Sequence, residues 1–182
     1  MLLLVASAAR DRAPRAAAAP GRPLLDAART LMDYLDAIRL AEPDPGRAGA
    51  AAERNGSWRT RRADRAARAL ALLSPEARAA VAARDGREGP HPLAPGWAAS
   101  RGRLLEEFRV ARVRRAPGGR AVATVVERYR SVAPDGALVS GTSDYLLAPV
   151  GGAWRIADRR PGGAFSDADL AALAAEPRGA AP

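Results

Sequence analysis

The stretch YLLAPVGGAWRIADRR, residues 145–160, holds two runs of strand-forming residues with a proline and two glycines between them. This order is typical of a β-hairpin, because glycine supplies the backbone angles that a tight turn requires. Alternation along the second run places Trp154, Ile156 and Asp158 on one face of the strand and Arg159 on the other. The stretch therefore predicts the closing hairpin of a sheet, with Asp158 either in a pocket or at a solvated strand end.

Two more strand patterns precede this hairpin along the chain, and a third includes its first strand. They are EFRVARV (107–113), RAVATVVERYRSV (120–132) and ALVSGTSDYLLA (137–148), and the turn sequences APGG and APDG separate them. Three hairpin turns joining four strands predict an antiparallel meander. The apolar alternation of the first strand slips after Val110, which predicts a β-bulge there.

Period-two alternation also predicts which side chains share a face of the sheet. Tyr129 falls on the same face as Val125 and Glu127. Asp144 and Tyr145 are neighbours in sequence, so they point to opposite faces and cannot both enter one pocket.

The first half of the chain has a helical period. In PLLDAARTLMDYLDAIRLAEP (23–43) an apolar stripe runs through Leu31 and Leu35, and Tyr34 borders it with its hydroxyl expected near water. A second helix is expected from about Trp58 to Leu73, and a third begins after Ser74, which can cap it. A short final helix over 166–173 would begin with Ser166 and Asp169 spaced as a capping box. Helices followed by an antiparallel sheet predict the α+β class, with the helices on one face of a curved four-stranded sheet.

Composition limits the chemistry open to the chain. Its 182 residues suit one domain, expected over 24–160, with an N-terminal segment 1–23 that is unstructured or the remnant of a signal peptide, and a C-terminal tail 161–182. The absence of cysteine excludes disulfides and thiolate chemistry, and the single histidine excludes a multi-histidine metal site. We expect no metal and no cofactor.

Charge and targeting signals leave the location of the protein open. The net charge is +9, but all 29 basic residues are arginine, as codon bias in a GC-rich bacterial genome would produce. Nucleic acid is therefore not the expected partner, although Arg61, Arg62, Arg65 and Arg68 could form an anion-binding surface. No apolar run reaches the roughly 20 residues of a membrane helix, so no membrane span is expected. The short run MLLLV before ASAA leaves a cytoplasmic and an exported protein as even alternatives.

The order of elements resembles the NTF2-like (cystatin-like, cone-shaped) superfamily, with its SnoaL-like and steroid isomerase-like members. The segments that carry the resemblance are LMDYLDAIRLAEPD, LLEEFRVARV, RAVATVVERYR and YLLAPVGGAWRIADRR, and it covers roughly residues 24–160. It implies a pocket between the concave sheet and the first helices, and a possible homodimer formed through the sheets. The lining residues expected for such a pocket are Leu31, Leu35, Trp97, Tyr145, Trp154 and Ile156.

Members of this superfamily include enzymes and non-catalytic modules, so function has to be argued from the site. The leading hypothesis is a non-catalytic binding or accessory module that holds a small apolar ligand or docks a protein partner. The alternative is a SnoaL-like or isomerase-like enzyme with Asp158 as acid or base and Tyr34 or Tyr129 as hydrogen-bond donor. His91, between two prolines, would be the other candidate base, and the arginine cluster leaves an anionic-surface binder as a second alternative.

Overall fold

The computed structural model describes residues 22–41, 56–84, 89–133 and 135–175. The helices that come first among the described residues are α1 (Arg22–Ala41), α3 (Gly56–Ala71) and α4 (Pro75–Ala83). The 3₁₀ turn η1 (Ala99–Arg101) leads into the strands β1 (Arg103–Ala116), β2 (Arg120–Ser131), β3 (Leu138–Val150) and β4 (Ala153–Pro161), and helix α5 (Asp167–Ala175) follows. The unstructured or signal-like segment expected at the N-terminus lies outside the described residues, apart from the start of α1.

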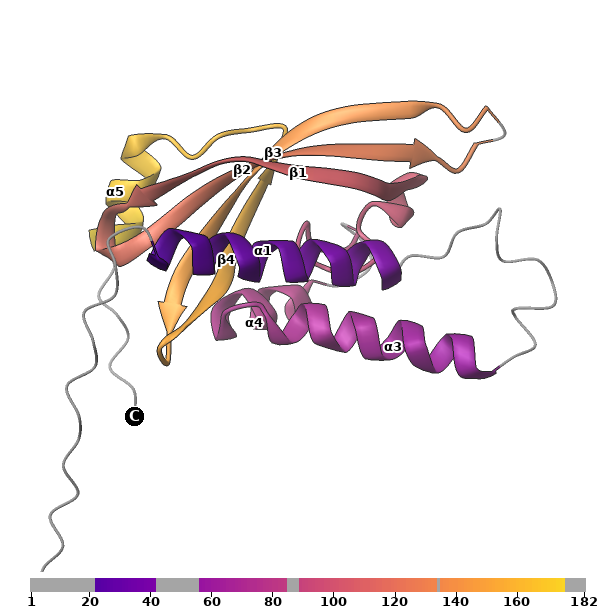
Figure 1. The fold of residues 1–182 in the computed structure, drawn as a ribbon, viewed down its shortest axis with the longest axis horizontal. Helices are drawn as coiled ribbons and strands as arrows, with labels where there is room; N and C mark the ends of the chain where they lie inside the picture. The colour runs from indigo at the N-terminus through magenta and orange to yellow at the C-terminus, as the bar shows by residue number, and fades with distance from the viewer. Residues whose placement is uncertain (1–21, 42–55, 85–88, 134, 176–182) are drawn as a thin grey trace, which may run out of the picture.

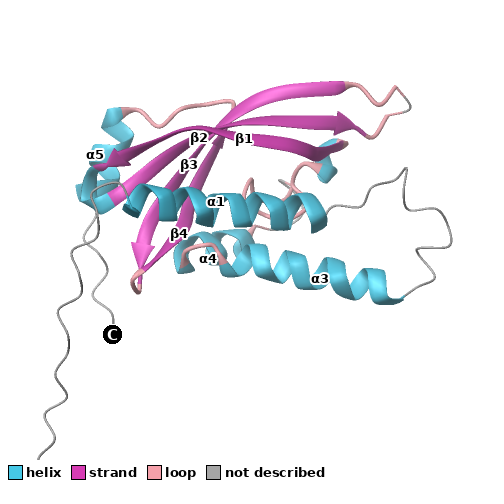
Figure 2. Ribbon diagram, in the orientation of Figure 1, coloured by secondary structure: helices cyan, strands magenta, loops and turns pink. Residues whose placement is uncertain are grey.

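The four strands form one antiparallel sheet in the order β1-β2-β3-β4, as the three turn sequences predict. Gly151 and Gly152, in the turn between β3 and β4, both have positive φ angles, which glycine adopts without steric cost. Figure 1 shows that α1 lies along one face of the twisted sheet, with α3 beside α1 and α4 near β4. The same view coloured by secondary structure separates this helical layer from the sheet (Figure 2). The α+β class is confirmed.

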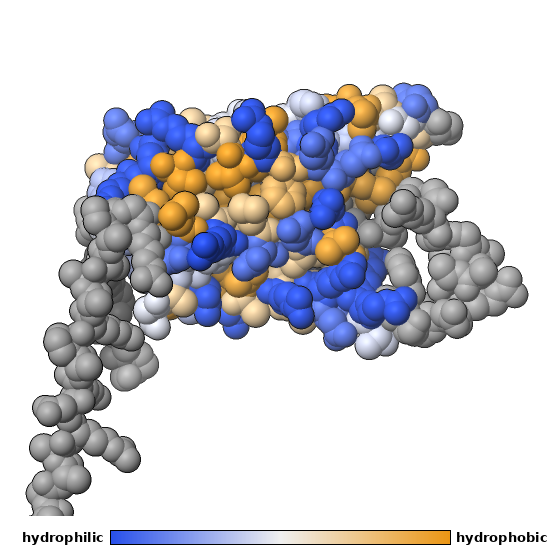
Figure 3. Space-filling view, viewed as in Figure 1, coloured by the Kyte–Doolittle hydropathy of each residue, from blue (hydrophilic) through white to orange (hydrophobic). Residues whose placement is uncertain are grey.

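The helices bury the apolar stripes that their sequences contain. Leu31 and Leu35 of α1 are fully buried against the sheet, together with Ile156 of β4. Tyr34 departs from expectation: its ring is fully buried, and its hydroxyl donates to the Leu93 carbonyl oxygen at 2.8 Å rather than reaching water. Figure 3 shows apolar and charged residues side by side on the surface in the view of Figure 1. Met32 of α1 is among the exposed apolar side chains of the described residues.

The start of α4 also ties the helical layer to the sheet. Ser74 caps this helix, as expected, by accepting a hydrogen bond from the Ala77 backbone N–H at 3.1 Å. Just before the cap, Leu73 forms a parallel bridge with Ile156, through backbone hydrogen bonds of 2.8 and 3.0 Å. The outer edge of β4 is therefore paired with the chain that enters α4.

Bulges interrupt two of the strands. In β1 the pairing with β2 shifts between Val110 and Arg112, which confirms the bulge expected there, and it shifts once more nearer the start of the strand. In β4 the neighbouring residues Leu146 and Leu147 of β3 pair with Asp158 and Ile156, so Ala157 is an extra residue in the ladder. The strict alternation expected along β4 is therefore wrong beyond Ile156.

Helix α5 packs on the face of the sheet opposite α1. Phe165 and Leu170 are buried there against Val122 and Leu146. The capping box predicted at its start is present, because the Asp169 N–H donates to Ser166 Oγ at 3.1 Å and the Ser166 N–H donates back to Asp169 Oδ2 at 2.9 Å. No helix in the described part of the chain is long and apolar enough to cross a membrane.

Candidate functional site

A glutamate occupies the apolar face of the central strand β2. Ala123 and Val125 alternate along this face and are fully buried, and Glu127 follows in the same register with only 2 % of its surface exposed. An ionised carboxylate at such a position is costly unless charged and polar groups surround it. The neighbours of Glu127 therefore define the site.

Arg159 of β4 supplies the balancing charge. Its Nη2 lies 3.0 Å from Glu127 Oε1 and 2.8 Å from Glu127 Oε2, and its side chain is 5 % exposed. Strict alternation from Ile156 would have turned Arg159 to the other face of the sheet. The extra residue Ala157 reverses the alternation and brings the guanidinium to the face that α1 covers.

Three hydroxyl groups complete the surroundings of the carboxylate. Tyr129 and Ser143 donate to Glu127 Oε2, each at 2.7 Å, and Tyr145 donates to Oε1 at 2.6 Å. Arg159 Nη2 also donates to the Tyr129 hydroxyl oxygen at 2.6 Å. Two carboxylate oxygens thus receive five hydrogen bonds, about as many as their lone pairs can accept.

The guanidinium of Arg159 has partners beyond this cluster. Its Nη1 donates to the Pro92 carbonyl oxygen at 2.9 Å, and its central carbon lies 4.5 Å from the centre of the Trp97 ring. Its Nε is buried without a hydrogen-bond partner among the residues that the structure describes. Burial by itself would lower the pKa of Arg159. The electrostatic interactions with Tyr145, Glu127 and Tyr129 are stronger, and they raise the pKa above its usual value. Arg159 is therefore a permanent cation.

Burial also governs the two tyrosines. It raises the pKa of Tyr129 and of Tyr145 well above the ordinary value of 10.0, and Glu127 raises both further, against the opposing effect of Arg159. Both hydroxyls are consequently neutral donors at neutral pH.

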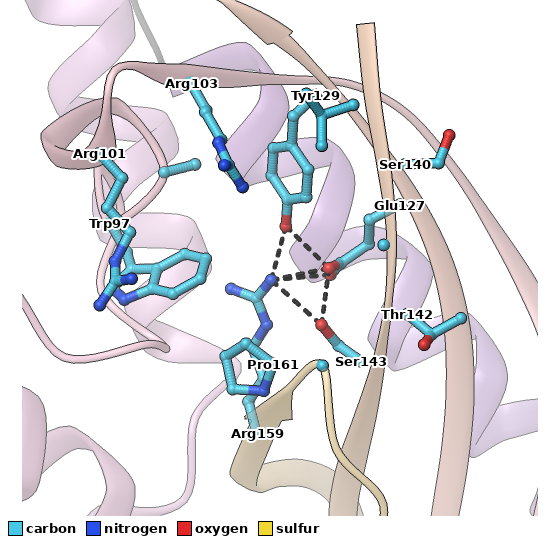
Figure 4. A pocket seen from close by; sticks show the side chains of 14 residues that line it. Trp97, Arg101, Arg103, Glu127, Tyr129, Ser140, Thr142, Ser143, Arg159 and Pro161 are labelled. Atoms are coloured by element: carbon cyan, nitrogen blue, oxygen red, sulfur yellow. Dashed lines mark hydrogen bonds and ion pairs between the residues drawn. The ribbon is translucent and has the colours of Figure 1, made fainter.

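A cavity of about 260 Å³ opens beside this cluster. Figure 4 shows the Tyr129 hydroxyl, the Glu127 carboxylate and the Arg159 guanidinium converging at one side of it, with Trp97 opposite β3. Its other lining residues are Ala98, Arg101, Arg103, Val139, Ser140, Gly141, Thr142, Ser143, Pro161 and Gly162. The cavity lies where β3 extends past its pairing with β4, which ends at Ser143 and Pro161.

Two further arginines stand on the side of the cavity formed by η1 and β1. Arg101 and Arg103 are exposed, and the Arg101 guanidinium carbon lies 4.8 Å from the centre of the Trp97 ring. Neither arginine forms an ion pair within the described ranges. Across the cavity, a Cβ added to Gly141 would meet no atom within 4 Å, so the absence of a side chain there keeps the space open.

The catalytic candidates inferred from sequence do not gather around this cavity. Tyr129 lines it, whereas Asp158, Tyr34 and His91 do not. Asp158 Oδ1 accepts a hydrogen bond from the Arg159 backbone N–H at 2.7 Å, and the Tyr129 hydroxyl is bonded to Glu127 instead. The structure does not form the expected pair of Asp158 with a tyrosine donor, because the bulge in β4 turns Arg159 inward.

His91 has a local structural contact. Its Nδ1 accepts a hydrogen bond from the Leu93 backbone N–H at 3.2 Å. Burial and the nearby Arg84 lower its pKa, against the opposing effect of Asp158. In the described part of the chain no three His, Cys, Asp or Glu side chains come together in a way that could hold a metal ion.

Of the residues expected to line a pocket, only Trp97 lines this cavity. Trp97 lines the cavity, and Trp154 packs at the margin of the core. Leu31, Leu35, Tyr145 and Ile156 lie within the core itself, where the space between α1 and the sheet is filled by side chains. None of these four lines the cavity beside Trp97, although the Tyr145 hydroxyl reaches Glu127.

Two arginines of the cluster on α3 connect that helix to the end of α1. Arg62 Nε donates to the Ala41 carbonyl oxygen at 2.7 Å, and Arg65 Nη1 donates to the Leu40 carbonyl oxygen at 3.1 Å. These carbonyls belong to the last turn of α1, where cations are favoured. Two of the four arginines are thus explained by packing of α3 against the end of α1.

No family model, curated protein or solved structure matches the chain. The function has to be inferred from the cluster and its cavity alone.

Sequence reasoning missed Glu127, Ser143 and Arg159. A signal for Glu127 was present, because alternation placed it on the apolar face of β2 beside Tyr129. Arg159 carried no comparable signal, since its orientation depends on an extra residue in β4 that the sequence pattern does not reveal.

Proposed function

We propose that the chain is a non-catalytic binding module that holds a small organic molecule in the cavity beside Trp97. The observation that carries this proposal is the state of Glu127, whose two oxygens already receive five hydrogen bonds. A general base needs an unoccupied lone pair directed at its substrate. Glu127 serves instead to fix the polar wall of the cavity.

The tyrosine hydroxyls likewise already donate hydrogen bonds to Glu127. The Tyr129 and Tyr145 protons point to Glu127, so neither can stabilise a developing oxyanion without breaking a charge-assisted hydrogen bond. Asp158, the residue of the enzyme alternative, lies outside the cavity lining. A rigid wall with all its donors used favours binding over proton transfer.

The size of the cavity suits a small ligand. Its volume of about 260 Å³ lies just below the roughly 300–1,000 Å³ of pockets for drug-sized molecules. Trp97, Val139 and Pro161 supply apolar surface for the body of such a ligand. This supports a ligand that is smaller and more polar at one end than the apolar molecule expected from sequence.

Membership of the NTF2-like superfamily is part of the proposal. It is supported by the helices described before a four-stranded antiparallel meander and by a cavity at one end of the sheet. Within that superfamily the chain would belong with the accessory and binding modules rather than with the enzymes.

A titration followed by nuclear magnetic resonance tests the binding role. Benzyl alcohol, a neutral probe, is added to the wild-type chain, and the indole N–H signal of Trp97 is assigned by its loss in Trp97→Phe. We expect this signal to shift with saturation. In Gly141→Leu the added side chain fills the cavity and should abolish the shift, whereas the control Ala111→Leu, on the exposed bulge of β1, should preserve it. A shift that persists in Gly141→Leu would place the probe elsewhere and refute the proposal.

A further inference from the structure

We propose that the ligand of this cavity is a small organic anion whose carboxylate is bound by Arg101 and Arg103. This inference rests on the binding role proposed above and adds the charge and the orientation of the ligand.

The charges around the cavity are unequal. Three arginines and one carboxylate line it, and the single carboxylate, Glu127, is paired with Arg159 at 2.8 Å. That pair leaves the charges of Arg101 and Arg103 without a carboxylate partner among the described residues. Uncompensated cations at a concave surface concentrate anions there. The cavity therefore favours a negatively charged ligand.

Arg101 is held in place before any ligand arrives. Its guanidinium lies over the Trp97 ring, 4.8 Å from the ring centre, and this contact limits the rotamers that the side chain samples. An arginine fixed in this way loses less conformational entropy when it binds a carboxylate. Arg103 lies two residues further along, at the start of β1, and its side chain points between Trp97 and Tyr129, whereas the Arg101 guanidinium lies beside the Trp97 ring (Figure 4). Planar guanidinium groups match the two oxygens of a carboxylate.

The opposite wall sets the direction of the ligand. An anionic group placed deeper would approach Glu127, whose negative charge repels it, and the Tyr129 and Ser143 protons there are already donated. The carboxylate of the ligand therefore lies at Arg101 and Arg103, with its organic body between Trp97 and Val139.

Three probes separate charge from shape. Benzoate carries a carboxylate on an aromatic ring, benzyl alcohol has nearly the same shape without the charge, and acetate has the charge without the ring. We expect benzoate to bind at least tenfold more tightly than either of the others in calorimetric titrations at low salt, and its advantage to shrink as sodium chloride is added.

Arginine variants test which side chains cause the preference for benzoate over benzyl alcohol. The double variant Arg101→Gln, Arg103→Gln should bind benzoate no better than benzyl alcohol, because the loss of affinity should be much larger for benzoate than for the neutral probe. The control Arg109→Gln removes an exposed arginine of the same strand outside the cavity and should keep the benzoate preference.

The outcomes distinguish this inference from the binding role beneath it. Equal affinities for benzoate and benzyl alcohol in the wild-type chain would overturn the anionic ligand and leave the binding role intact. A benzoate preference that survives the double variant would also overturn it. Acetate binding as tightly as benzoate would overturn it too, because the organic body of the ligand would then contribute nothing. If none of the three probes binds, both proposals fail.

Discussion

Glu127 and Arg159 form a buried ion pair in a chain whose other described ion pairs are all more exposed. The side chains are 2 % and 5 % exposed, whereas in the Glu107–Arg128 pair on the same sheet they are 63 % and 47 % exposed. Removing one partner of a buried pair leaves the other charge without compensation in a medium of low polarity. The same chemical change should therefore have very different costs at the two glutamates.

Glu127→Gln keeps the shape of the side chain and removes its charge. We expect it to lower the free energy of unfolding by about 3–5 kcal/mol, because Arg159 stays buried and charged. The matched control Glu107→Gln should cost at most about 1 kcal/mol. Urea unfolding followed by circular dichroism measures both, and similar losses in the two variants would contradict a specific role of burial.

Residue identity alone predicted part of this site. The period of β2 placed Glu127 and Tyr129 on one apolar face, which the structure confirms. The partner of Glu127 could not be found in that way, because its position depends on the register of another strand. A buried glutamate signals that some cation must lie nearby, but it does not say which of 29 arginines it is.

At the scale of elements, the bulge in β4 decides what the site contains. Helix bounds, turns and strand order followed from periodicity, proline and glycine, since these signals are local in sequence. The bulge at Ala157 depends on how β4 fits β3 and the chain before α4, which is a tertiary effect. One extra residue places Arg159 rather than Asp158 at the site, and this explains why Asp158 does not line the cavity although the α+β class was confirmed.

Helix α5 closes the second face of the sheet at one end. Leu170 is 3 % exposed there, so Leu170→Ala should lower the free energy of unfolding by about 2–3 kcal/mol. Leu25→Ala, at a position 61 % exposed on α1, serves as control and should change it by no more than about 0.5 kcal/mol. Guanidinium unfolding gives both values, and a neutral Leu170→Ala would mean that α5 does not contribute to the stability of the sheet.

The hydrogen bonds between α3 and the end of α1 should contribute to the stability of the fold. Arg62→Gln removes the guanidinium that donates a 2.7 Å hydrogen bond to the Ala41 carbonyl oxygen, and should lower the free energy of unfolding by about 1–2 kcal/mol in thermal unfolding. Arg61→Gln changes the charge by the same amount at an exposed neighbouring position and should be nearly neutral. Equal effects would assign the cost to net charge rather than to this contact.

At the scale of the whole molecule, the tyrosines link the site to stability in alkali. The chain has three tyrosines, all buried, and the folded pKa values of Tyr129 and Tyr145 lie above those of the unfolded chain. Below about pH 10 both states hold these protons and the stability is fully present. As the pH rises further the unfolded state ionises first, so stability falls.

Tyrosinate absorbance in a pH titration measures this directly. We expect the signals of Tyr129 and Tyr145 to stay absent beyond about pH 10 and to appear together with loss of the circular dichroism of the fold. In concentrated urea all three tyrosines should ionise near pH 10. If two or more ionise near pH 10 while the fold persists, the hydroxyls are not held as described.

The two edges of the sheet differ in a way that bears on how copies of the chain meet. The backbone of Leu72 and Ser74 occupies the edge at β4, whereas β1, at the other edge, exposes Arg109, Arg112 and Arg115. A second copy that extended the sheet through β1 would place its own β1 arginines next to these. Electrostatic repulsion between charged edge strands prevents edge-to-edge aggregation. Strand addition between copies is therefore disfavoured at low ionic strength.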